Sequence, residues 1–165
     1  MTKVNLVVQA RMGSSRLPGK MMLDLYGEPL IFRILERLSD CKLINQLILA
    51  IPDGNFDDVL AEVAARLPGV ATVRGSEENL VDRFQAAIKS YPCEFVIRFP
   101  GDNIFPDPVQ IDNLIRFHLK YNPDGFSSNL ANVNGNNMID GVGAEIFSTN
   151  LLMNLTSENT NEAQK

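Results

Sequence analysis

Val4-Asn5-Leu6-Val7-Val8 opens the stretch that decides the fold class, and Gln9-Ala10-Arg11-Met12-Gly13-Ser14-Ser15-Arg16-Leu17-Pro18-Gly19-Lys20 completes it. The opening residues form a short apolar run rich in valine, which predicts a buried strand. The residues after it place Arg11, Arg16 and Lys20 among glycines and serines. A loop of this composition at the end of a buried strand can present backbone N–H groups and cations to one polyanion. We therefore expect the loop to bind a nucleoside triphosphate.

The rest of the chain alternates between short apolar runs, which predict strands, and amphipathic stretches, which predict helices. Strands are expected at 46–51, 70–73, 94–99, 126–130 and 145–147. Helices are expected at 29–38, 57–67, 80–88 and 108–121, with a last one capped by Ser148 or Thr149. This alternation predicts a three-layer α/β/α fold whose Rossmann-like, mostly parallel sheet is covered by helices on both faces. We expect a single domain over residues 1–165.

The composition narrows the classes of partner. The 165 residues carry a net charge of -5, with a pI near 4.9. A general nucleic-acid binder needs a basic surface, so we expect no nucleic-acid partner. Cys41 and Cys93 belong to no C-x-x-C pair, which leaves neither a zinc motif nor a disulfide framework. Neither a signal peptide nor a membrane-spanning run is visible, so we expect a cytoplasmic protein without membrane insertion.

A second polar cluster, Gly101-Asp102-Asn103, follows the strand predicted at 94–99. Ligands of open parallel sheets bind beyond the carboxyl ends of the strands, near the point where the strand order reverses. The cationic loop and this cluster would then lie side by side, with cations for a triphosphate and a carboxylate for its metal. Mg²⁺ completes its coordination with phosphate oxygens and water, so one carboxylate is a sufficient anchor. The sequence thus predicts a Mg²⁺ site at Asp102.

The loop is neither a Walker motif nor G-x-G-x-x-G. Ala10-Arg11-x-x-Ser14-x-Arg16-Leu17-Pro18-Gly19-Lys20, followed by Gly27-x-Pro29-Leu30-Ile31, resembles the signature of the sugar cytidylyltransferases. That family includes the 3-deoxy-manno-octulosonate and acylneuraminate enzymes and the spore-coat polysaccharide nucleotidyltransferases. The last group is the best match, because the chain resembles it again at Arg74-Gly75-Ser76-Glu77, Leu80-x-Asp82-Arg83-Phe84 and Arg98-x-x-Gly101-Asp102. The resemblance implies a sheet of the nucleotide-diphospho-sugar transferase type.

The resemblance also implies an activity and the residues that perform it. CMP would pass from CTP to a sugar or sugar acid with release of pyrophosphate, in the biosynthesis of surface polysaccharide. The catalytic residues would be Arg11, Lys20 and Asp102, the last as the Mg²⁺ ligand. The residues expected to bind the nucleotide are Gln9, Ala10, Arg11, Gly13, Ser14, Ser15, Arg16, Lys20, Arg74, Gly75 and Ser76. Asn129 and Glu145 would face the acceptor sugar.

Several alternatives stay open. Spore-coat-type members continue beyond the point where this chain ends, at Gln164-Lys165, so we expect a domain that lacks its C-terminal portion. Such a domain could bind a nucleotide or a partner protein without turnover. A glycosyltransferase that uses a nucleotide sugar is a further alternative, but Asp102-Asn103-Ile104 supplies no D-x-D motif. A homodimer formed through an apolar edge is also expected. Asp82-Arg83 favours a surface ion pair or a structural link, and His118 a surface or partly packed position.

Overall fold

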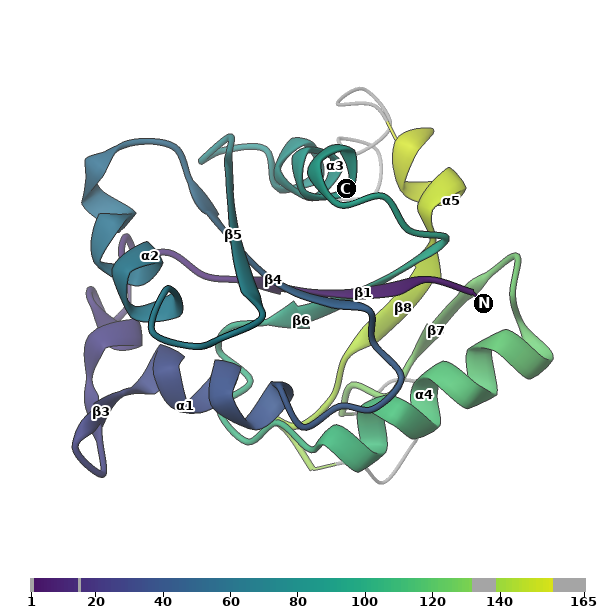
Figure 1. The fold of residues 1–165 in the computed structure, drawn as a ribbon, viewed down its shortest axis with the longest axis horizontal. Helices are drawn as coiled ribbons and strands as arrows, with labels where there is room; N and C mark the ends of the chain where they lie inside the picture. The colour runs from purple at the N-terminus through teal and green to yellow at the C-terminus, as the bar shows by residue number, and fades with distance from the viewer. Residues whose placement is uncertain (1, 15, 132–138, 156–165) are drawn as a thin grey trace.

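The computed structural model describes residues 2–14, 16–131 and 139–155. Six strands form one sheet in the order β5-β4-β1-β6-β8-β7 (Figure 1). Their bounds are β1 Val4–Gln9, β4 Gln46–Pro52, β5 Val70–Gly75, β6 Phe95–Pro100, β7 Phe126–Ser128 and β8 Glu145–Ser148. The first four in spatial order are parallel, whereas β8 is antiparallel to both β6 and β7. The predicted mostly parallel sheet is confirmed.

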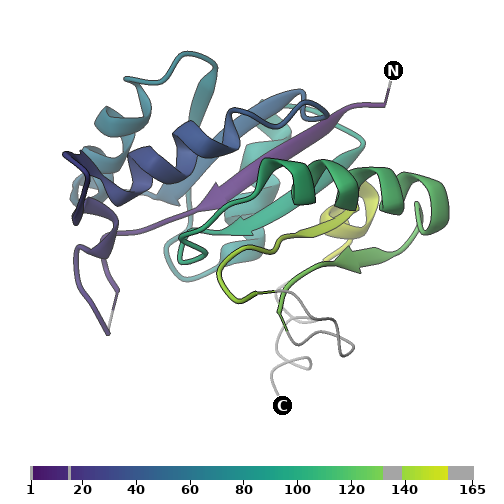
Figure 2. The ribbon, with the colours of Figure 1, turned by 90° about the horizontal axis from the view of Figure 1, so that it is seen from below.

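Helices cover both faces of this sheet. Their bounds are α1 Leu30–Leu38, α2 Asp58–Ala64, α3 Leu80–Ser90, α4 Pro108–Tyr121 and α5 Thr149–Met153. The residues of β1 alternate between the faces, as a strand requires. Leu6 and Val8 pack in the core with α1, α2 and α4, whereas Val7 packs with α3 and α5. Figure 2 shows α1 and α4 on the viewer's side of the sheet. Among the described residues, no helix is both long and apolar enough to cross a membrane.

Local signals in the sequence fix the starts of three helices. The Asn79 side chain accepts a hydrogen bond from a backbone N–H of α3, and Asp107 does the same for α4. Ser148, one of the two residues predicted for this role, caps α5. Such caps satisfy N–H groups that have no partner inside the helix. The predicted helices are confirmed, although α2 ends at Ala64 rather than near residue 67.

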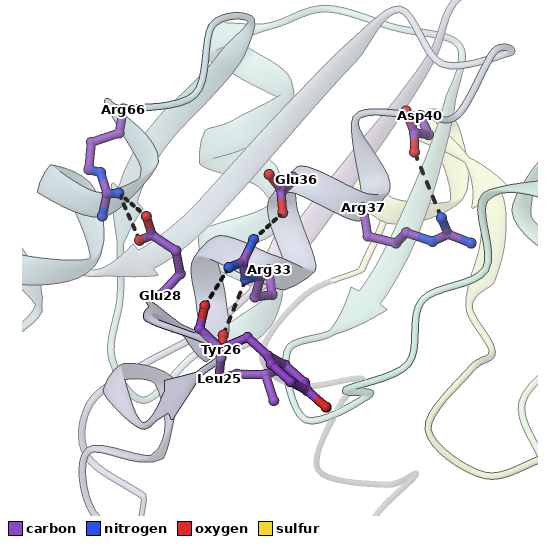
Figure 3. Close-up of polar contacts among 8 residues, drawn as sticks. All are labelled: Leu25, Tyr26, Glu28, Arg33, Glu36, Arg37, Asp40 and Arg66. Atoms are coloured by element: carbon purple, nitrogen blue, oxygen red, sulfur yellow. Dashed lines mark hydrogen bonds and ion pairs between the residues drawn. The ribbon is translucent and has the colours of Figure 1, made fainter.

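A small hairpin between β1 and α1 was not predicted. Its strands, β2 Asp24–Leu25 and β3 Glu28–Pro29, are too short to show a periodic pattern. Tyr26 and Gly27 form the turn, both with positive φ. Figure 3 shows that Arg33 donates hydrogen bonds to the carbonyls of Leu25 and Tyr26, while Arg66 pairs with Glu28. Arg33 of α1 and Arg66, just beyond the end of α2, therefore hold the hairpin in place.

The strand order reverses between β1 and β6. After β1 the chain moves through α1 to β4 on one side, and β6 later pairs with the other side of β1. The Gly101 N–H donates to the Gln9 carbonyl at 2.9 Å, and a Cβ at Gly101 would clash with the same oxygen. Glycine thus lets the ends of β1 and β6 approach closely, at the place where open α/β sheets bind their ligands.

Candidate active site

A cleft of about 360 Å³ opens at the carboxyl ends of β1 and β6, beside the N-terminus of α3. Half of the predicted site residues, seven of fourteen, line it. The lining side chains and glycine are Gln9, Ala10, Arg11, Ser14, Arg16, Lys20, Met21, Glu77, Glu78, Leu80, Arg83, Gly101 and Asp102. Four are cationic and three are carboxylates, so the cleft differs in charge balance from the acidic chain as a whole.

The two predicted polar clusters meet in this cleft. Lys20 Nζ lies 3.5 Å from Asp102 Oδ2, which joins the loop after β1 to the turn after β6. The Asp102 side chain is 53% exposed, and Lys20 is 24% exposed. Such an exposed pair contributes little to stability. Both groups are instead accessible to a ligand that carries phosphates and a metal.

The cationic loop folds around the backbone of Met12. The Met12 carbonyl accepts hydrogen bonds from the N–H groups of Ser14 at 2.9 Å and Gly19 at 3.0 Å. The Met12 N–H donates to the buried carboxylate of Asp57 at 2.7 Å. These three N–H groups are engaged within the protein, so the backbone contacts expected for a polyanion fall to other N–H groups of the loop. The exposed side chains of Arg11 and Arg16 add positive charge to the loop.

Ser15, which was predicted to bind the nucleotide, lies outside the described residues. Ser14 lines the cleft, and its Oγ accepts a weak hydrogen bond from the Leu17 N–H at 3.4 Å. Gly13 lies across from Glu77, because a Cβ at Gly13 would be 3.7 Å from Glu77 Oε1. The loop after β1 therefore faces the segment between β5 and α3.

Arg83 builds the opposite wall of the cleft. Its side chain is buried and donates three hydrogen bonds, two to the Ser76 carbonyl and one to that of Glu77, at 2.7–3.0 Å. Burial, followed by the nearby Arg11 cation, lowers the pKa of Arg83. Arg83 thus serves as the predicted structural link to the preceding loop. Its guanidinium also contributes to the lining of the cleft.

Besides Arg83, five lining residues were not predicted as site residues: Met21, Glu77, Glu78, Leu80 and Gly101. The signal for three of them is present in the sequence, because residues 77–80 lie at the start of a predicted helix that follows a strand. In a parallel sheet, the N-terminus of such a helix lies at the same edge as the strand ends. Met21 follows Lys20 in a short 3₁₀ helix, Lys20–Met22, which periodicity could not reveal.

The structure does not bring Arg74 into the cleft. Its guanidinium pairs with Asp58 and donates to the Gly54 carbonyl at 2.8 Å, so it links β5 to the start of α2. Gly75 and Ser76 lie behind the wall rather than on it. A Cβ at Gly75 would be 3.0 Å from Arg83 Cα, and Ser76 Oγ accepts from the Asn79 N–H at 2.9 Å.

Asn129 and Glu145 also lie outside the lining of the cleft. Asn129 Oδ1 accepts from the Ala144 N–H at 2.7 Å, which fixes the approach to β8. Glu145 pairs with Arg98, and Arg98 Nε donates to Gln9 Oε1 at 2.9 Å. Both side chains are therefore engaged in contacts within the protein, and only Glu145 is connected to the cleft, through Arg98 and Gln9.

The cleft suits a metal that brings most of its own ligands. Within the described part of the chain, no three His, Cys, Asp or Glu side chains converge as a metal site. Asp102 nevertheless presents exposed carboxylate oxygens among cations, and hard oxygen ligands are those that Mg²⁺ prefers. The donor set fits an ion that binds one protein carboxylate together with phosphate oxygens and water.

Residues 6–165 match the family described as cytidylyltransferase. The chain belongs to this family. It is 34% identical to the spore coat polysaccharide biosynthesis protein SpsF of Bacillus subtilis, over 75% of this chain and 53% of that protein. It is 32% identical to a 3-deoxy-manno-octulosonate cytidylyltransferase of Chloroherpeton thalassium, over 68% of this chain and 45% of that protein.

A solved cytidylyltransferase of Leptospira borgpetersenii superposes on this chain with a TM-score of 0.83 at 32% identity. The superposition covers 93% of this chain and 63% of the Leptospira chain. The chain spans about half the length of the curated relatives it matches. The recognised resemblance and the expected α/β nucleotidyltransferase fold are both confirmed.

Proposed function

We propose that this cytidylyltransferase transfers CMP from CTP to a sugar or sugar acid, with Mg²⁺ bound at Asp102 and release of pyrophosphate. The observation that carries the proposal is the meeting of Lys20 and Asp102 at 3.5 Å where the strand order reverses. A cation and a carboxylate that are adjacent and accessible match a triphosphate with its metal. Membership of the cytidylyltransferase family supports the transfer of a cytidylyl group. The similarity to SpsF supports a role in polysaccharide biosynthesis.

Each predicted residue of the cleft has a role in this proposal. Arg11, Arg16 and Lys20 neutralise the triphosphate, and Ser14 hydrogen-bonds to it. Because negative charge grows on the α-phosphate and on the departing pyrophosphate, fixed cations stabilise the transition state more than the ground state. Mg²⁺ at Asp102 would polarise phosphate oxygens. A sugar hydroxyl attacks the α-phosphorus in line with the leaving group.

The remaining predicted residues divide into two groups. We assign Gln9 and Ala10 to the pyrimidine and ribose, and Gly13 to a further contact with the nucleotide. We assign supporting roles to Arg74, Gly75, Ser76, Asn129 and Glu145, because their contacts hold the walls of the cleft or its surroundings. Ser15 keeps its predicted nucleotide contact as a proposal. Because CTP is a cytoplasmic metabolite, the proposal includes a cytoplasmic location. The proposal also includes the expected homodimer, which light scattering tests.

Titration calorimetry with CTP, UTP, GTP and ATP, each with Mg²⁺, tests the nucleotide. CTP should bind most tightly, and EDTA should weaken its binding. Arg11→Ala and Lys20→Ala should each weaken CTP binding by about 1–3 kcal/mol, as expected for a lost charged hydrogen bond. Arg37→Ala is the matched control, because Arg37 is an exposed cation of α1 that contacts Asp40 outside the cleft (Figure 3).

Pyrophosphate release with CTP and 3-deoxy-manno-octulosonate tests the transfer step. Release that depends on both substrates and is lost in Asp102→Asn supports the proposal. No binding of any nucleotide would overturn the substrate assignment, and tighter binding of another base would redirect it. CTP binding without release across a panel of sugar acids would favour the alternative of a nucleotide-binding protein without turnover.

A further inference from the structure

A row of three polar side chains crosses the sheet from the cleft to β8. Arg98 lies opposite Val7 of β1 and opposite Glu145 of β8 in the register of the sheet. Gln9 follows Val7 by two residues, so all three side chains lie on the face that α3 and α5 cover. Their neighbours in these strands on that face, Val7 and Val96, are buried and apolar. Charged side chains such as Arg98 and Glu145 are unusual on a face with buried apolar neighbours, so their contacts call for an explanation.

The chemistry of Arg98 fixes the orientation of Gln9. A guanidinium can only donate hydrogen bonds, so the atom of Gln9 that lies 2.9 Å from Arg98 Nε must be the amide oxygen, Oε1. The amide nitrogen of Gln9, with two N–H donors, is then the group that this cleft residue offers to a ligand. Among the described residues, no acceptor contacts that nitrogen.

Glu145 in turn fixes Arg98. The two side chains form an ion pair in which Glu145 is 16% exposed and Arg98 is 30% exposed. A partly buried guanidinium without this carboxylate would lose its counter-charge and would turn toward solvent or toward the triphosphate. The ion pair therefore holds Arg98 in a position from which its Nε donates to Gln9 Oε1.

We infer that Gln9 is a specificity-determining residue and that Arg98 and Glu145 are its positioning residues. This inference rests on the proposed function and adds the chemistry of one contact. The oriented amide selects a ligand group that accepts hydrogen bonds and does not donate them. Two sources carry such a group: the N3 and O2 edge of cytosine, and the carboxylate of a sugar acid.

Gln9→Met identifies the source, because it keeps the length and neutrality of the side chain and removes the donor. Calorimetry is done separately with CTP plus Mg²⁺ and with 3-deoxy-manno-octulosonate. If the base is the source, affinity for CTP falls by about tenfold and affinity for the sugar acid stays the same. If the carboxylate is the source, affinity for the sugar acid falls by about tenfold and affinity for CTP stays the same. Unchanged affinity for both ligands overturns the inference.

A double-mutant cycle tests the positioning role. Arg98→Met should weaken binding of the affected ligand several-fold in the wild-type background and have no further effect in a Gln9→Met background. Glu145→Gln should act in the same direction as Arg98→Met and also lose its effect without Gln9. Equal effects of Arg98→Met in both backgrounds would show a purely structural role and overturn the positioning assignment.

Two controls keep the outcomes distinct. Arg66→Met removes the guanidinium of a comparable ion pair, with Glu28, in the hairpin of Figure 3, and should leave both affinities unchanged. Lys20→Ala tests the proposed function independently. If wild-type protein binds CTP and Lys20→Ala binds it more weakly while Gln9→Met changes neither affinity, the proposed function stands and the present inference fails. If wild-type protein binds no nucleotide, both fail.

Discussion

Gly101 occupies the point of closest approach between the ends of β1 and β6. A Cβ there would clash with the Gln9 carbonyl, which also accepts the Gly101 N–H. We predict that Gly101→Ala lowers the free energy of unfolding by about 1–3 kcal/mol, the usual cost of an overpacked site. Urea denaturation measures the change. Gly13→Ala is the matched control, because its Cβ would meet only Glu77 Oε1 at 3.7 Å; equal losses in both variants would contradict this explanation.

His118 is fully buried, which corrects the expectation of a surface or partly packed position. Its Nδ1 lies 2.9 Å from Ser127 Oγ, and its ring meets Phe95 edge to face. Nε2 has no hydrogen-bond partner within the described structure. The helical pattern did place His118 on α4, but Phe117 and Leu119 on either side gave no indication of which of the three faces the sheet.

The buried imidazole makes stability depend on pH. Burial lowers the pKa of His118 from its ordinary value of 6.5. As the pH falls, the unfolded chain therefore takes up this proton before the folded chain does. The contribution of neutral His118 to the free energy of unfolding is fully present above pH 6.5 and decreases below it. Urea denaturation at pH 7.5 and 5.5 should show a larger loss for the wild type than for His118→Asn, which does not titrate. An equal loss in both proteins would assign the effect to other groups.

At the scale of elements, the short helix η2, Asn55–Asp57, supports a loop that lies far from it in sequence. Buried Asp57 accepts the Met12 N–H at 2.7 Å and so fixes the loop that carries Arg11 and Lys20. We predict that Asp57→Ala lowers the free energy of unfolding by about 1–3 kcal/mol, because it leaves a backbone donor unpaired. It should also weaken CTP binding, although Asp57 does not line the cleft.

Asp57→Asn is the control for this prediction, since its amide oxygen can still accept the hydrogen bond. Thermal unfolding and titration calorimetry on both variants separate the contributions. If Asp57→Asn weakens binding as much as Asp57→Ala, the charge of Asp57 matters rather than its hydrogen bond, and the explanation given above is wrong.

The elements that the sequence predicted are those with a strong hydrophobic pattern. The helix α4 shows helical periodicity, and the strands β1, β4 and β6 show short apolar runs, because both of their faces are buried in the core. The β2–β3 hairpin shows none, since its strands have two residues each and its turn depends on a tyrosine with positive φ. Side-chain contacts at long range, such as those of Arg33 and Arg66, decided its position.

The same distinction applies to the two arginines of the β5–α3 region. Arg74 and Arg83 flank, in sequence, the lining residues Glu77 to Leu80. The resemblance predicted that Arg74 binds the nucleotide. The structure directs Arg74 toward Asp58 and Arg83 toward the cleft wall. Local sequence cannot decide this, because the direction of each guanidinium depends on carbonyl and carboxylate groups from other elements.

At the scale of the whole molecule, the cleft exists only in the folded chain, because its residues come from the end of β1 and the loop after it, from the start of α3 and the residues just before it, and from the turn after β6. A ligand that binds only the folded state stabilises it, by about 2.7 kcal/mol at a concentration 100 times the Kd. We predict that CTP with Mg²⁺ at this concentration raises the Tm by roughly 5–10 °C. Differential scanning fluorimetry measures the shift. Lys20→Ala at the same CTP concentration should show a smaller one, and an equal rise in that variant would contradict binding at this cleft.

The whole-molecule topology was only partly predictable. Alternating strands and helices predicted parallel pairing, and the position of the cleft followed from it. The position of β8 in the sheet could not be predicted from the alternation, because β7 precedes β8 in sequence whereas β8 lies between β6 and β7 in space. Which strand takes an edge depends on the fit of whole layers, here on Ile146 against one face and Phe147 against the other.

The insertion of β8 between β6 and β7 also orders the events of synthesis on the ribosome. All residues that line the cleft precede β7 and β8 in the chain, so the four parallel strands can assemble first. Among the described strands β7 pairs with β8 alone, so it has no strand partner until the residues between the two are translated. At about 5–20 residues per second this wait lasts on the order of a second or more. The residues that form the cleft are therefore all synthesised before the strand that completes the sheet.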